Sequence, residues 1–157
     1  MNNAPVRKPP APAGLFRLLN PVMKLLLNSP MHRLISSNLM LLTFTGRKSG
    51  RRYSTPVGYL RRGNLVYVMT QSPWWVNLRG GAAVTVRLQG ISYQGMARVV
   101  DDPETIKTMV RELMAVRGEA MARRLGYWTE DVNAPAQKVA QDVQGTIFIQ
   151  VELAQVT

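Results

Sequence analysis

Six short segments with an alternating hydrophobic pattern constrain the fold of this chain more than any other feature. In the clearest of them Val84, Val86 and Leu88 alternate with polar side chains, which is typical of a β-strand with one buried face. Turn residues such as Gly63 and Gly90 separate neighbouring segments, so consecutive strands can pair as hairpins. The predicted strands are Leu39–Thr45, Arg52–Leu60, Leu65–Thr70, Ala83–Gln89, Ile91–Asp101 and Thr146–Leu153.

Short strands in this order favour an antiparallel barrel over a parallel sheet, within an α+β protein that is mainly β. Helical spacing appears only outside the strands. Asp102 and Pro103 form a helix start, because Asp is a preferred N-cap and Pro fits the first helical position. Gly118 is predicted to end this helix, and two shorter helices are predicted at Glu119–Leu125 and Pro135–Val143.

The N-terminal part differs from the rest of the chain. Residues 1–13 contain four prolines and are predicted to be a flexible arm, and residues 14–157 are predicted to form a single domain. Residues 14–36 are predicted to be helical, with apolar residues at three- and four-residue spacing up to residue 28. The apolar run is too short to span a bilayer. This helix either covers one end of the core or lies on a membrane surface through its basic flanks.

Charge is distributed very unevenly along the chain. Residues 1–100 contain no Asp or Glu and carry 14 of the 20 Lys and Arg, so their net charge is +14. The remaining residues carry 6 basic and 9 acidic side chains, a net charge of −3. A positive region of this size attracts anions, and the candidates are a polyanionic cofactor, nucleic acid or anionic lipid.

The same composition excludes several kinds of active site. The chain has no Cys and one His, His32, so a thiolate nucleophile and a multi-histidine zinc site are excluded. The first hundred residues offer no pair of carboxylates for glycoside hydrolysis. An enzyme with so few acid–base groups is expected to take its reactivity from a cofactor.

The loop after the first predicted strand is the first candidate site. Gly46 and Gly50 enclose Arg47, Lys48 and Ser49. Glycines can adopt positive φ and bring backbone N–H groups close to an anion, and Arg and Lys add positive charge. The loop is therefore either a cradle for a phosphate or carboxylate between two strands, or an ordinary basic hairpin.

A pair of tryptophans forms the second candidate site. Trp74 and Trp75 are followed closely by Asn77, Leu78 and Arg79. In one helical turn Trp74, Asn77 and Leu78 share a side, and Trp75 points toward Arg79. Both rings can belong to the core, or Asn77 and Arg79 can hold a ligand beside one of them.

Taken together in this order, the segments Leu41–Gly50 and Trp74–Leu78 resemble the deazaflavin-dependent nitroreductase family of the split β-barrel flavin/deazaflavin oxidoreductase superfamily. The resemblance implies a six-stranded split barrel that binds coenzyme F420, with FMN as the less favoured cofactor. It implies an enzyme that passes a hydride from F420H2 to a quinone, nitroaromatic or activated alkene.

The resemblance also implies which residues bind the cofactor. Gly46, Arg47, Lys48, Ser49 and Gly50 would contact the phosphate and acidic tail, and Thr55, Pro56 and Val57 would line the ring. Trp74, Asn77, Leu78 and Arg79 would form the wall behind it. Tyr127 and Trp128 stand where family enzymes place substrate-facing aromatic residues, and core packing is the alternative for both.

The chain departs from the family pattern in two places. Tyr53 stands where Arg is common, and the loop Gln71–Pro73 is several residues shorter than in the nitroreductases. The alternative function is therefore a barrel that binds lipid or a membrane without catalysis. Nucleic-acid binding is disfavoured, because the aromatic residues are not interleaved with the basic cluster.

The same features predict the cellular location and the partners of the protein. No secretory signal is recognised, so the cytoplasm is the expected location, with peripheral contact at the inner membrane face through residues 14–36 as an option. The expected partners are a small-molecule acceptor and, from the resemblance, a second copy of the chain in a homodimer.

Overall fold

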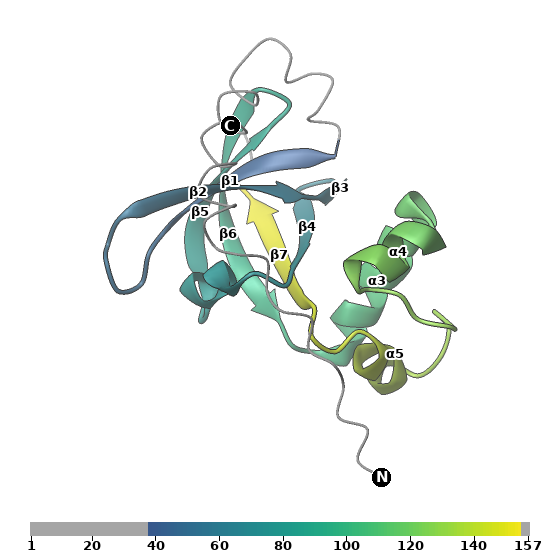
Figure 1. Cartoon of the computed structure of the whole chain (residues 1–157). Helices are drawn as coiled ribbons and strands as arrows, with labels where there is room; N and C mark the ends of the chain where they lie inside the picture. Colours follow the sequence, from purple (N-terminus) through teal and green to yellow (C-terminus); the bar gives the residue numbers. More distant parts are fainter. Residues whose placement is uncertain (1–37, 155–157) are drawn as a thin grey trace.

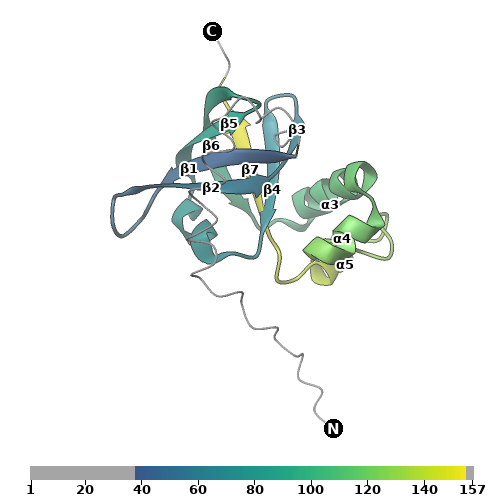
Figure 2. The ribbon, with the colours of Figure 1, turned by 45° about the horizontal axis from the view of Figure 1, so that its top comes forward.

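The computed structural model describes residues 38–154, in which one antiparallel sheet curls into a barrel-like body (Figures 1 and 2). Seven strands occur in the order β2-β1-β5-β6-β7-β4-β3. Their bounds are β1 Leu39–Thr45, β2 Arg52–Gly58, β3 Leu60–Arg62, β4 Leu65–Thr70, β5 Ala82–Leu88, β6 Ile91–Val100 and β7 Ile147–Leu153.

The predicted six strands become seven because the second one breaks at Tyr59. β2 pairs with β1, whereas β3 pairs with β4, at the other end of the strand order. The chain thus passes from one edge of the sheet to the other through a single residue, which requires the sheet to curl until its edges approach each other. The backbone N–H of Tyr59 donates to the carbonyl of Asn38 at this junction.

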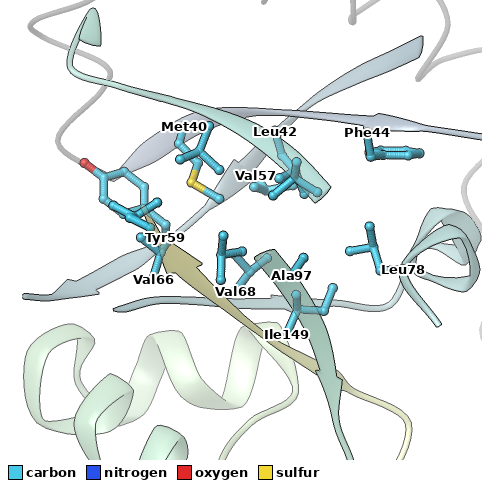
Figure 3. Packing of buried hydrophobic residues seen from close by; sticks show 14 of the residues in the cluster. Met40, Leu42, Phe44, Val57, Tyr59, Val66, Val68, Leu78, Ala97 and Ile149 are labelled. Carbon is cyan, nitrogen blue, oxygen red and sulfur yellow. The ribbon is translucent and has the colours of Figure 1, made fainter. Parts of the chain in front are cut away.

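The inside of the curled sheet holds the first hydrophobic core. Met40, Leu42 and Phe44 project from alternate positions of β1 and are almost completely buried. Figure 3 shows them facing Val68 and Ile149, with Phe44 near one end of the core and Tyr59 near the other. Strand alternation therefore directs every second β1 side chain inward, as predicted.

Three helices lie together on one side of the sheet (Figures 1 and 2). They are α3 Pro103–Arg117, α4 Glu119–Leu125 and α5 Ala136–Asp142. The Asp102 carboxylate accepts a hydrogen bond from the Thr105 N–H at 2.9 Å, which confirms the predicted N-cap and lowers the pKa of Asp102. A second core cluster, which includes Met109, Tyr127 and Phe148, joins the helices to the outer face of the sheet.

The predicted arm of residues 1–13 and the predicted helices of residues 14–36 lie outside the described residues. Within residues 38–154, no helix has the length and apolar character needed to cross a membrane.

Candidate functional site

The loop Gly46–Gly50 connects β1 to β2 and is closed by its own hydrogen bonds. The Gly46 N–H donates to the Arg51 carbonyl at 2.8 Å, and the Gly50 N–H donates to the Gly46 carbonyl at 3.0 Å. Gly50 has a φ of 67°, as the sequence predicted for this turn. Gly46 does not have the positive φ expected from the sequence; a Cβ there would lie 2.7 Å from both Ser49 Oγ and Tyr53 Cε2, so a larger residue would displace these side chains.

These bonds change which groups can bind an anion. The N–H groups of Gly46 and Gly50 donate to carbonyls within the loop, that of Arg51 donates to Ser49 Oγ, and that of Arg47 donates to Asn77 Oδ1. The backbone donors left for a ligand in this loop are therefore the N–H groups of Lys48 and Ser49. The exposed Lys48 side chain adds a charge beside them.

The loop is braced against the 3-10 helix η1 (Pro73–Leu78), which carries the tryptophan pair. Asn77 makes the central contact: its Oδ1 accepts from the Arg47 N–H at 3.0 Å, and its Nδ2 donates to the Trp74 carbonyl at 2.9 Å. The Arg47 guanidinium donates to the Val76 carbonyl at 3.1 Å. The structure thus brings the two sequence motifs together, and Arg47 and Asn77 hold them in place.

Aromatic rings continue from the loop toward the barrel interior. Phe44 stacks on Tyr53 at a centroid distance of 6.0 Å and on Trp74 at 5.6 Å. Trp75 points away toward Arg79, whose guanidinium lies 4.5 Å from the ring centroid, as predicted. Leu78 is fully buried in the first core, so its place is structural.

A groove of about 440 Å³ lies at the junction of the loop and η1. Its described lining residues are Gly46, Arg47, Lys48, Ser49, Tyr53, Val76 and Asn77. None of these side chains carries a carboxylate or an imidazole. The groove therefore combines positive charge with hydrogen-bond donors and one aromatic wall, a set of groups that fits an anionic ligand with a flat ring.

The predicted ring-lining residues of β2 lie outside this lining. Thr55 and Pro56 are partly buried on β2, which stands at one end of the strand order. That position explains why a residue without an N–H donor is tolerated in the strand. Val57 is 8% exposed and belongs to the first core cluster.

Tyr127 and Trp128 are not brought to the groove. Tyr127 is fully buried in the second core cluster, where burial raises the pKa of its phenol and its hydroxyl has no hydrogen-bond partner within residues 38–154. Trp128 packs against the same cluster and carries the Arg123 guanidinium 3.6 Å from its ring centroid. Their surroundings correspond to the core-packing alternative.

Replacing Tyr127 by phenylalanine is expected to raise the free energy of unfolding by about 1 kcal/mol, because the lost hydroxyl is buried and unpartnered. Thr129→Val is the matched control. The Thr129 hydroxyl is equally buried but donates to Asp142 Oδ2 at 2.8 Å, so its loss should lower stability by about 1 kcal/mol. Urea unfolding measures both. A large loss of stability in Tyr127→Phe would show that the Tyr127 hydroxyl makes a stabilising hydrogen bond after all.

Two residues of the site were missed by the sequence analysis as possible contributors. Phe44 was considered only as part of a strand, and Val76 only as part of a motif. In the structure the Phe44 ring stacks on Tyr53 and Trp74, and the Val76 carbonyl accepts a hydrogen bond from the Arg47 guanidinium. The signal for Phe44 was available, since it is the last inward-facing residue before the glycine loop. No local signal pointed to a backbone carbonyl of Val76.

Comparison with known families gives one match that covers more than half of the chain. A family model described as "F420H(2)-dependent quinone reductase" matches residues 27–123. This range includes both motifs, the loop and the 3-10 helix. No curated protein sequence matches the chain.

Solved structures show the same fold at low sequence identity. The heme storage protein HutZ from Vibrio cholerae is 11% identical with a TM-score of 0.53, covering 82% of this chain and 92% of that one. A putative pyridoxamine 5'-phosphate oxidase from Listeria innocua is 15% identical with a TM-score of 0.50, covering 80% and 90%. A chain described as a domain-swapped dimer is 15% identical with a TM-score of 0.52, covering 90% and 100%. These likenesses confirm the predicted split-barrel class.

Proposed function

The chain belongs to the F420H(2)-dependent quinone reductase family, and from this premise we propose that its acceptor is a quinone, with nitroaromatics and activated alkenes as the alternatives. The family makes the protein an F420H2-dependent reductase with coenzyme F420 as its cofactor. When bound, that cofactor supplies the hydride. The chain's own residues bind it, orient it and leave room for the acceptor.

The observation that supports this proposal most is the composition of the groove. F420 carries a phosphate and several carboxylates, and the groove offers Lys48, the N–H groups of Lys48 and Ser49, and no described acidic side chain. We assign the acidic part of the cofactor to these donors and the flat ring to the side of Tyr53. Arg47 and Asn77 act through their contacts with η1, by keeping the donors in place.

The roles of the remaining predicted residues follow from their positions. We propose that Thr55, Pro56, Trp74 and Arg79 border the ligand only beyond the groove described above. Val57 and Leu78 support it from the core. The scarcity of acid–base groups at the groove agrees with a reaction in which the protein positions two reactants.

Titration of the full chain with oxidised F420 tests the cofactor assignment. The expected result is saturable quenching of tryptophan fluorescence, because Trp74 and Trp75 lie on the helix that borders the groove. The absence of saturable quenching would overturn the cofactor assignment.

Turnover with F420H2 and a short-chain benzoquinone, a nitroaromatic or an unsaturated ketone then separates the acceptor classes. A rate no higher for the quinone than for the others would contradict the quinone proposal.

Lys48→Ala is expected to weaken F420 binding about 3- to 10-fold, and the loss should shrink as salt is added, because Lys48 is exposed and its charge is screened. The matched control is Lys107→Ala, which removes the same charge from α3, outside the groove lining. Equal losses in both variants would show that only net charge matters and would argue against a local contact.

We propose that the enzyme is cytoplasmic. We also propose that it forms a homodimer, and the similar structure described as a domain-swapped dimer supports this proposal. Membrane contact through residues 14–36 stays a prediction, because those residues lie outside the described part of the chain.

A further inference from the structure

A second cavity, of about 370 Å³, lies at the other end of the barrel. It borders Asn38, which precedes β1, whereas the cofactor groove begins at Gly46, which follows β1. Eight residues of extended chain separate the two positions by roughly 25 Å. Figure 3 shows the same separation inside the core, with Tyr59 at this end and Phe44 at the end near the groove. The two cavities are therefore distinct.

The first cation of this cavity is Arg61, whose guanidinium is held in a fixed orientation. Its Nε donates to the Gly63 carbonyl at 2.9 Å, its Nη1 donates to the Tyr93 hydroxyl at 3.4 Å, and the group lies 4.9 Å from the Tyr93 ring centroid. These contacts leave Nη2 available and pre-position the charge at the mouth of the cavity.

The second cation is Arg117, at the C-terminal end of α3. Its Nη2 donates to the Tyr59 carbonyl at 2.5 Å, and its Nε is buried without a hydrogen-bond partner among the described residues. A buried donor of this kind costs free energy unless a ligand or water satisfies it. Arg61 and Arg117 come from positions 56 residues apart and line the same cavity.

Neither arginine has a carboxylate partner within residues 38–154. The next residue, Arg62, shows the contrast, because its Nε lies 2.6 Å from Glu112 Oε2. Residues 1–37, which precede Asn38 in the sequence, contain no Asp or Glu. Among the described residues, the charge of both arginines at the cavity is therefore not neutralised by a carboxylate.

Apolar groups complete the lining. Ile91 and Val116, which are 58% and 51% exposed, offer accessible aliphatic surface at the cavity. Leu60 and Leu88 lie buried beneath them. The Tyr59 phenol, whose pKa is raised by burial, also lines the cavity and carries no charge that would repel an anion.

We propose that this cavity binds an amphiphilic anion, a carboxylate or phosphate head group at Arg61 and Arg117 joined to a short apolar tail on Ile91 and Val116. The site is independent of the cofactor groove. Its ligand can be a free carboxylate or the head of an anionic lipid, since both present the same chemistry to two guanidinium groups.

Calorimetric titration of the full chain with sodium decanoate, below its micelle concentration, tests the site. We expect saturable binding to one site. Decanol, which lacks the charge, and inorganic phosphate, which lacks the tail, should each bind at least about tenfold more weakly. Absence of saturable binding, or equal binding of decanol, would overturn the proposal.

Arg61→Gln is expected to weaken decanoate binding roughly tenfold, because one charge-assisted contact is lost. Arg62→Gln is the matched control: it removes the same charge one residue away, from an arginine already paired with Glu112, and should leave binding within about twofold. Equal losses in the two variants would contradict the site. Arg117→Gln is a second test, provided that its circular dichroism matches the parent, because this arginine also holds the Tyr59 carbonyl.

Flotation with phosphatidylglycerol and phosphatidylcholine vesicles separates the two sources of the ligand. Binding only to phosphatidylglycerol, and its loss in Arg61→Gln, would identify a lipid head group. Binding to decanoate without vesicle binding would identify a free carboxylate. F420 affinity should be unchanged in Arg61→Gln, and a parallel loss would show that the two cavities are not independent.

Discussion

Replacing Phe44 by alanine should lower the free energy of unfolding by about 3–5 kcal/mol and also weaken F420 binding. Phe44 is 4% exposed, and its ring stacks on both Tyr53 and Trp74. Its removal leaves a cavity in the first core and takes away the support under the aromatic wall of the groove. Urea unfolding and F420 titration measure the two effects.

Phe148→Ala is the matched control for this prediction. Phe148 is 1% exposed, but it belongs to the second core cluster, beneath the helices. We expect a similar loss of stability with F420 affinity unchanged under conditions where both variants are folded. If the two variants weakened F420 binding equally, Phe44 would have no role in the groove beyond general stability. Phe44→Leu, which keeps most of the buried volume, should retain most of the stability and lose the ring contacts.

Asn77→Ala is expected to weaken F420 binding about 10- to 100-fold and to lower the free energy of unfolding by about 1–2 kcal/mol. Its amide joins the loop to η1 through Arg47 and Trp74. Without this link, cofactor binding must order the loop, and each residue that becomes fixed costs about 1–2 kcal/mol. Asn77 is therefore a positioning residue, and both atoms of its amide are already engaged.

Hydrogen exchange distinguishes this role from direct contact with the cofactor. In Asn77→Ala, the Arg47 amide loses its acceptor and should exchange faster in the cofactor-free protein. The matched control is Asn64→Ala, in the exposed turn between β3 and β4, which should change neither exchange at Arg47 nor F420 affinity. An unchanged exchange rate at Arg47 in Asn77→Ala, together with weaker binding, would favour direct contact instead.

Both expected results depend on contacts between segments that the sequence treats separately. Arg47 and Asn77 are thirty residues apart, and local pattern indicates only that each belongs to a polar motif. The resemblance assigned both to the cofactor. The structure shows in addition that the Asn77 amide accepts from the Arg47 N–H, a contact that neither motif predicts by itself.

The strands also show which features local pattern predicts and which depend on contacts between distant segments. β1 has the predicted bounds, because inward and outward residues alternate without interruption and Gly46 ends the pattern. The predicted strand Arg52–Leu60 continues the alternation through Tyr59, yet its two parts pair with different strands. Periodicity records which side chains face the core and contains no information on which strand is the partner.

By itself, the sequence determined the β-rich class, the glycine-bounded basic loop, the N-cap at Asp102 and an acid-free first hundred residues, because these depend on neighbours along the chain. Only the tertiary structure decided that the chain crosses between the two sheet edges at Tyr59, that Asn77 braces Arg47, that Tyr127 is buried, and that Arg61 and Arg117 line the same second cavity. Strand pairing and side-chain burial bring together residues that are far apart in the chain, and local spacing does not encode that choice.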